Sequence, residues 1–231
     1  MEDENPKTED ATSIEDEMRP ILAAWRSISE YCRVRNVDVL IASKGRSTEA
    51  ISALYRAGQT HFGENRVDEL VAKAQELDNL PIKWHFIGHL QSNKCKMLAS
   101  VKGLYMVESI DSVKTAMELD KCLERVSKTV KVLVQVNTTL REQFGILYNQ
   151  MEKVREVVSA VLASQHLEFS GLMTIGDGTS ECYARLISVR SELERSVGPC
   201  KVMSMGMSHD WKDAIEGGST QVRVGRCLFE A

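Results

Sequence analysis

The spacing of hydrophobic residues changes repeatedly along this chain. Over residues 14–34 apolar positions recur every three or four residues, which predicts an amphipathic helix. The next run, DVLIAS at 38–43, is short and mostly apolar, and it ends at Lys44 with Ser47 following as a candidate helix cap. This pattern predicts a strand, then a loop, then a second helix.

The same alternation continues to the end of the chain. Further strand-like runs lie at 60–63, 83–87, 104–109, 130–137, 167–175, 201–206 and 220–225. Helical patterns fall at 47–57, 65–78, 91–100, 111–127, 149–164, 181–196 and 209–217. This spacing is what parallel β-α-β units require. The segment VLVQV at 132–136 is almost continuously apolar, which is typical of a parallel strand buried on both faces.

Eight strands alternating with helices predict a single (β/α)8 TIM-type barrel with an extra N-terminal helix. We expect helix 14–34 to cover the surface that a helix after the eighth strand normally shields. An open, doubly wound sheet is the alternative fold, because it has the same alternation of elements. The predicted organisation is an acidic flexible tail at 1–12 and a barrel domain at 13–231.

Composition narrows the class of protein. The chain has 231 residues, of which 43% are hydrophobic and 27% charged, as in an ordinary globular domain. Its net charge of −4 gives no overall attraction for nucleic acid. The start, MEDENPKTED, lacks the features of a signal or transit peptide, and no apolar run is long enough to span a bilayer. We therefore expect a cytoplasmic protein with no membrane role and with its six widely spaced cysteines reduced.

Functional side chains of a β/α barrel lie just past the strand ends, and Lys44 holds that position after the first strand. A lysine emerging from an apolar strand is poorly solvated, which favours the neutral amine that Schiff-base chemistry needs. The alternative is a lysine whose aliphatic stem packs at the strand end while its ammonium stays in water.

The ends of the last two strands have the composition of a phosphate site. In SMGMS (204–208) and VRVG (222–225), Gly206 and Gly225 allow close approach of backbone N–H groups, and Ser204 and Ser208 supply hydroxyl donors. Ordinary glycine turns remain the alternative. The histidines of WHFIGH have metal-like spacing, but they lie on a strand entering a loop and not on a helix, so we predict no metal.

Eight segments together resemble the pyridoxal phosphate homeostasis proteins, a family similar to the N-terminal barrel of alanine racemases. The resemblance runs in order from about residue 20 to the end of the chain. Its segments are Lys44, FGEN (62–65), WHFIGHLQSNK (84–94), VESIDS (107–112), VQVNT (134–138), GLMTIG (171–176), SMGMS (204–208) and VRVG (222–225).

The resemblance implies a role for individual residues toward pyridoxal phosphate. Lys44 matches the Schiff-base lysine, Asn65 lies near the cofactor ring, and Ser208 and Gly225 match phosphate contacts. Arg223 matches the residue at the pyridine nitrogen, where a permanent cation opposes protonation of the ring and weakens it as an electron sink.

The sequence departs from the family at three places near these residues. Arg66 stands where tyrosine is usual, and Gly45-Arg46 replaces the usual residues after the lysine. Arg226 replaces a common hydroxyl residue, which removes one phosphate donor and adds a cation that pairs with the phosphate if it turns inward.

The resemblance implies a carrier that is not an enzyme. Such a protein binds pyridoxal phosphate reversibly on Lys44, limits the free aldehyde and supplies the cofactor to apo-enzymes. The related racemases take a second catalytic base from a C-terminal domain that this chain is too short to contain, and without that domain we expect a monomer.

One alternative is a low-efficiency pyridoxal phosphate-dependent amino-acid racemase. Another is a Schiff-base aldolase for a phosphorylated sugar, which carries no coloured cofactor.

Overall fold

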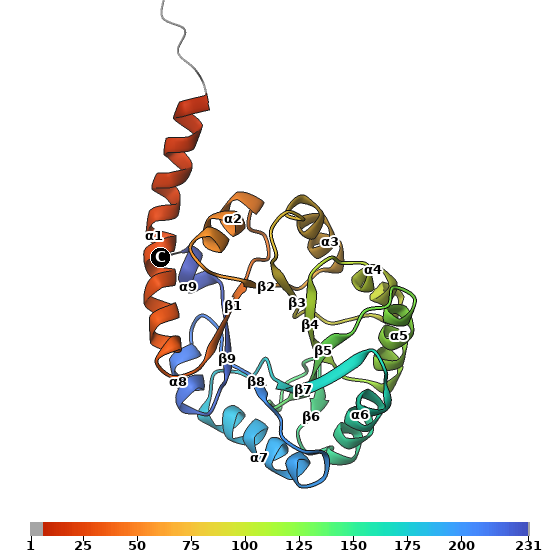
Figure 1. Cartoon of the computed structure of the whole chain (residues 1–231). Coiled ribbons are helices and arrows are strands. Elements are labelled where there is room, and N and C mark those ends of the chain that lie inside the picture. Colours follow the sequence, from red (N-terminus) through yellow and green to blue (C-terminus); the bar gives the residue numbers. More distant parts are fainter. Residues whose placement is uncertain (1–6, 231) are drawn as a thin grey trace, which may run out of the picture.

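The computed structural model describes residues 7–230, with side chains from Met18 onward. Within this range eight parallel strands form a barrel, surrounded by helices (Figure 1). The strands are β1 (Asp38–Ala42), β2 (His61–Glu64), β3 (Lys83–Phe86), β4 (Leu104–Ile110), β5 (Val130–Asn137), β7 (Leu167–Met173), β8 (Val202–Ser204) and β9 (Gln221–Val224). Because β1 pairs with β9 and β4 pairs with β5, the barrel is closed. The predicted barrel is confirmed, and the open sheet is wrong.

Each predicted connecting helix is present. They are α2 (Thr48–Arg56), α3 (Val67–Glu76), α4 (Cys95–Ala99), α5 (Val113–Glu124), α6 (Met151–Ala163), α7 (Ser180–Val197) and α8 (Trp211–Glu216). The pattern at 91–100 forms a 3-10 turn, η1 (Ser92–Lys94), followed directly by α4. Side-chain caps start several helices, since Ser47, Ser112 and Thr179 each accept a hydrogen bond from a backbone N–H in the first turn.

The N-terminal helix α1 (Lys7–Arg33) begins earlier than predicted. Residues 7–12, which we expected in a flexible tail, are helical, because KTEDATS at 7–13 contains neither glycine nor proline to stop the helix. The rest of the predicted tail, 1–6, lies outside the described residues. Helix α1 packs against β1, α2 and α9 (Arg226–Phe229), so it covers the expected surface together with a short final helix (Figure 1).

The core has two unequal parts. A large apolar cluster packs the outward side chains of the strands against the helices. A small second cluster of Met106, Leu133 and Met173 lies apart from it. Buried polar side chains of the strands, including Glu108 of β4 and Gln221 of β9, are hydrogen-bonded to each other although their strands are not neighbours. Part of the barrel interior is therefore a polar network.

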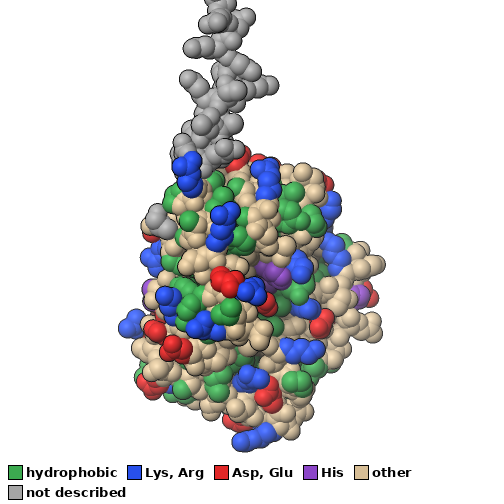
Figure 2. All heavy atoms as spheres, turned by 60° about the vertical axis from the view of Figure 1, so that its left-hand side comes forward, with side chains coloured by type: hydrophobic (Ala, Val, Ile, Leu, Met, Phe, Trp, Pro, Cys, Tyr) green, Lys and Arg blue, Asp and Glu red, His purple; other side chains and the backbone are tan. Residues whose placement is uncertain are grey.

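The outer surface carries mixed charge. Seen from the side where α1 comes forward, Lys and Arg side chains are interspersed with Asp and Glu (Figure 2). This face therefore offers no uniform basic surface among its described side chains for a polyanion.

Between residues 7 and 230, no helix has both the length and the apolar content that a bilayer crossing requires.

The free cysteines should differ sharply in reactivity. Burial raises the pKa of Cys32 and Cys200 to about 11 and that of Cys95 to about 12, whereas Cys227 is only half-buried. Because the thiolate is the reactive form, iodoacetamide at pH 8 should label Cys227 first in the folded protein. Peptide mass mapping after brief labelling measures this order, and early labelling of Cys95 would contradict it.

Candidate functional site

A cavity of about 400 Å³ lies at the C-terminal ends of the barrel strands. Its volume falls in the range of small-molecule sites. The cations Lys44, Arg46, Arg223 and Arg226 line it, and none of its described lining residues is Asp or Glu. A cluster of cations without a carboxylate favours an anionic ligand.

Most of the predicted site residues meet in this cavity. Its lining includes Lys44, Asn65, Ser208, Arg223, Gly225 and Arg226, which lie at or just past the C-terminal ends of four different strands, apart from Arg223 on β9 itself. Sequence reasoning did not assign Ile87, Gln135, Phe144 and Ile175, which also line it. Phe144 belongs to the loop after β5, and its ring stacks on His89 with the ring centroids 4.0 Å apart.

Two predicted residues lie elsewhere. Ser204 is fully buried, and its hydroxyl donates to Glu108 Oε2 at 2.6 Å while it accepts a hydrogen bond from Arg223, so its proton is directed into the barrel interior and not into the cavity. Gly206 has φ +92°, and a Cβ there would lie 2.4 Å from the Cβ of Ala214. Gly206 therefore allows the close packing of α8, and it is not among the described lining residues of the cavity.

Lys44 lies two residues past the end of β1, after Ser43, and lines the cavity. Its side chain is exposed, so the protein alone does not supply the desolvation that the apolar strand before it predicted. The buried residue at this strand end is its neighbour Ser43, whose hydroxyl donates to Glu64 Oε1 at 2.6 Å.

The loops after β8 and β9 meet at one side of the cavity. Ser208 Oγ accepts a hydrogen bond of 3.0 Å from the N–H of Gly225, which fixes the two loops to each other. Arg226 follows in the chain and is exposed. Arg46 is held nearby, with its guanidinium 3.6 Å from Glu230 and over the ring of Phe229. This side of the cavity thus combines a hydroxyl with cations.

Arg223 of β9 lines the cavity from the barrel interior, although the residue is only 6% exposed. Its guanidinium donates to Ser204 Oγ and to the carbonyl of Thr174, each at 2.7 Å. Burial lowers the pKa of Arg223, and the charge of Glu108 opposes that shift. Arg223 is therefore a buried cation whose orientation is fixed by protein partners.

Glu108 is the centre of the polar network beneath Arg223. It is fully buried and accepts hydrogen bonds from Ser204, from Gln221 Nε2 at 2.7 Å and from His85 Nδ1 at 2.7 Å. Burial raises the pKa of Glu108, but the hydrogen bond and charge of His85 and the charge of Arg223 hold it below its usual value. Glu108 is thus a carboxylate that compensates Arg223 inside the barrel.

The network continues away from the cavity through a second histidine. His85 Nε2 lies 2.8 Å from His61 Nδ1, and His61 stands at the start of β2. Burial and the nearby charge of His85 lower the pKa of His61 to about 3, so it is neutral at physiological pH. The only sequence signal for this network is a set of single polar residues inside apolar strands.

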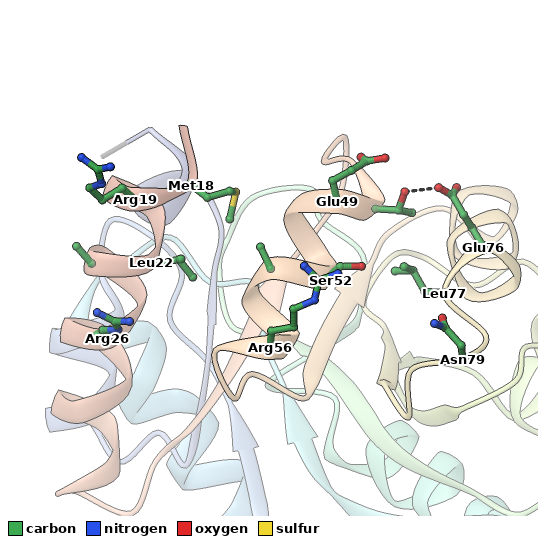
Figure 3. A pocket seen from close by; sticks show the side chains of 13 residues that line it. Met18, Arg19, Leu22, Arg26, Glu49, Ser52, Arg56, Glu76, Leu77 and Asn79 are labelled. Carbon is green, nitrogen blue, oxygen red and sulfur yellow. Dashed lines mark hydrogen bonds between the residues drawn. The ribbon is translucent and has the colours of Figure 1, made fainter. Parts of the chain in front are cut away.

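A larger cavity of about 910 Å³ lies outside the barrel, between α1, α2 and the end of α3 (Figure 3). Arg26 and Arg56 line it together with Glu49 and Glu76, so its charge is mixed. Glu76 is already hydrogen-bonded to Thr48. Since barrel sites lie at the C-terminal strand ends, the smaller cavity is the candidate site.

Comparison with known proteins identifies the family. Residues 23–231 match the family model described as alanine racemase, N-terminal domain. The pyridoxal phosphate homeostasis protein of Schizosaccharomyces pombe is 37% identical over 209 residues, which cover 87% of this chain and 87% of that protein. This chain belongs to the pyridoxal phosphate homeostasis protein family. The resemblance found in its sequence motifs is confirmed.

This member of the pyridoxal phosphate homeostasis family is similar in structure to two kinds of solved barrel protein. PipY of Synechococcus elongatus with pyridoxal phosphate (PLP) bound is 31% identical, with a TM-score of 0.79 over 90% of this chain and 99% of that one. An alanine racemase of Clostridium difficile is 13% identical, with a TM-score of 0.74 over 92% of this chain and 59% of that one. The second similarity shows a shared barrel fold only.

Proposed function

We propose that this chain binds pyridoxal phosphate reversibly as a Schiff base on Lys44, limits the free aldehyde and supplies the cofactor to apo-enzymes. The observation that carries the proposal is the cavity in which an exposed lysine is surrounded by three arginines and by no carboxylate among the described lining residues. PipY, a relative at 31% identity, has a structure with PLP bound. When bound, pyridoxal phosphate supplies an aldehyde that condenses with a primary amine.

The residues of the cavity fit this cofactor. Ser208 and the N–H of Gly225 are already hydrogen-bonded at one side, where Arg226 adds a cation, and we assign the phosphate to that side. Asn65 and Arg223 line the remainder and are assigned to the ring. The guanidinium of Arg223 carries donors only, so it binds an unprotonated ring nitrogen.

The same residues argue against strong catalysis. An unprotonated ring nitrogen is a weak electron sink, which disfavours carbanion formation. Racemisation also needs a base on each face of the substrate carbon. Besides Lys44 and the arginines, His89 is the one titratable side chain among the described lining residues, and its ring is stacked on Phe144.

A low-efficiency amino-acid racemase is the competing function, and a Schiff-base aldolase is the third. Exchange of the α-hydrogen of an amino acid in deuterated water, followed by mass spectrometry, separates a racemase from a carrier. A yellow chromophore in stoichiometric amount excludes the aldolase.

The first test is the absorbance of the wild type and of Lys44→Ala after incubation with pyridoxal phosphate. We expect the wild type to form a Schiff-base band and Lys44→Ala to form none, because the variant lacks the amine. Borohydride reduction and peptide mapping should place the label on Lys44. Lys201→Ala, at an exposed lysine outside the cavity, is the matched control and should keep the band. A label on another lysine contradicts the proposal.

A second experiment tests whether the protein supplies the cofactor. Protein loaded with pyridoxal phosphate is mixed with an apo-enzyme that needs it, and the activity that the apo-enzyme recovers is measured.

A further inference from the structure

A buried ammonium lies beneath the turn that carries Lys44. Lys73 of α3 has a side chain only 10% exposed, and its Nζ donates to Ser43 O at 2.7 Å, to Glu64 Oε1 at 2.7 Å and to Glu69 Oε1 at 2.9 Å. These partners use all three donors of the ammonium. A buried lysine destabilises a fold unless it is paired. The position of Lys73 therefore points to a role of this ammonium in holding its three partners.

The carboxylates of the same cluster bind both neighbours of Lys44. Glu64 Oε1 accepts from the hydroxyl of Ser43 at 2.6 Å, and Glu69 Oε1 accepts from the N–H of Gly45 at 2.7 Å. Ser43 is fully buried, whereas Lys44 between these two anchored residues is exposed and lines the cavity. The backbone is therefore fixed on each side of the one residue whose side chain is free to react.

The three residues of the cluster, which we call the lysine clamp, come from adjacent elements. Glu64 ends β2, and Glu69 and Lys73 lie one turn apart on α3. Burial raises the pKa of Glu64, and the hydrogen bonds from Lys73 and Ser43 oppose that rise. The clamp thus joins α3 to the end of β1 through charge-assisted hydrogen bonds, which are stronger than neutral ones.

We propose that the lysine clamp positions Lys44 for bond formation. Fixing the backbone at 43 and 45 restricts the direction of the Cα–Cβ bond of Lys44, so the amine starts from a limited set of positions facing the cavity. Positioning of this kind accelerates bond formation without adding affinity for the ligand. The inference rests on the proposed function of Lys44.

The test compares bond formation with binding in variants of Glu69. Glu69→Ala removes the acceptor for the N–H of Gly45, whereas Glu69→Gln keeps an oxygen there. We expect Glu69→Ala to slow Schiff-base formation with pyridoxal phosphate about 10-fold and Glu69→Gln to change it less than about 2-fold. Affinity for pyridoxine 5′-phosphate, which has an alcohol in place of the aldehyde, should stay within about 2-fold in both variants.

A second pair of measurements separates positioning from folding. Lys73→Met alone leaves a buried carboxylate uncompensated, so the double variant Glu64→Gln with Lys73→Met removes both charges together. In this double variant, Schiff-base formation with pyridoxal phosphate should also be slower, with little loss of affinity for pyridoxine 5′-phosphate. In the ligand-free protein, hydrogen exchange of the Gly45 amide should be faster in Glu69→Ala than in Glu69→Gln.

Each outcome decides the inference. An unchanged rate in Glu69→Ala, or an equal loss of rate and of pyridoxine 5′-phosphate affinity, overturns a positioning role. If the wild type forms no Schiff base on Lys44, the proposed function fails. Exchange of the Gly45 amide then still decides whether the clamp fixes this turn, and an unchanged exchange rate overturns the clamp as well.

Discussion

Glu108→Leu should lower the free energy of unfolding by about 3–5 kcal/mol, the usual cost of leaving a buried charge without its partner. The substitution removes the carboxylate that compensates Arg223, and it leaves Ser204, His85 and Gln221 without their shared acceptor. Urea denaturation followed by circular dichroism measures the change.

Two controls make this result specific. Glu168→Leu makes the same substitution at an exposed position of β7 and should change stability by less than about 0.5 kcal/mol. Combining Glu108→Leu with Arg223→Met should cost less than the sum of the single variants, because the two groups compensate each other. Additive losses would show that Glu108 stabilises the barrel independently of Arg223.

The pH dependence of stability gives a further check on Glu108. Its pKa is lower in the folded protein than the ordinary value of 4.5. The carboxylate therefore contributes its full stability above about pH 4.5, and the contribution is lost as pH falls through the lower folded pKa. In Glu108→Gln this part of the acid dependence should disappear.

The strand-and-helix alternation was sufficient to predict the barrel, because each element has a local signal. The run at 130–137 is short, apolar and bounded, and β5 occupies the same residues. By contrast, β6 (Ile146–Leu147) has two residues and α9 has four, so neither contains a full period of any hydrophobic pattern. Arg226 of α9 lines the candidate site, and β6 follows the loop whose Phe144 also lines it, so short irregular pieces carry side chains of the site.

Contacts distant in sequence explain why the motif alone did not show that the Ser204 hydroxyl faces the barrel interior. Within SMGMS the pattern does not distinguish a serine facing the cavity from one facing the barrel interior. The partner that decides it, Glu108, is 96 residues away. Ser208, four residues later, does line the cavity. Lys44 was placed in the cavity because a strand end is a local feature, but its exposure depends on side chains from other loops.

Gly88 provides the second large expected effect, because no side chain fits at its position. A Cβ at Gly88 would lie 2.0 Å from the carbonyl oxygen of Asn65, which is a backbone atom. Gly88→Ala therefore forces the loop after β2 away from the end of β3 and should destabilise the protein by about 3 kcal/mol. Because Asn65 lines the cavity, affinity for pyridoxine 5′-phosphate should fall as well.

The matched control for Gly88→Ala is Gly198→Ala. Gly198 has φ +87° and ψ −176°, a region open essentially only to glycine, so alanine there should lose about 1–3 kcal/mol from backbone strain although the space around its Cβ position is open. It lies at the end of α7, outside the cavity lining, so its binding of pyridoxine 5′-phosphate should be unchanged. Urea denaturation and calorimetric titration measure both quantities. If the two variants are equally stable and bind equally well, the close approach of β3 to Asn65 does not determine the shape of the site.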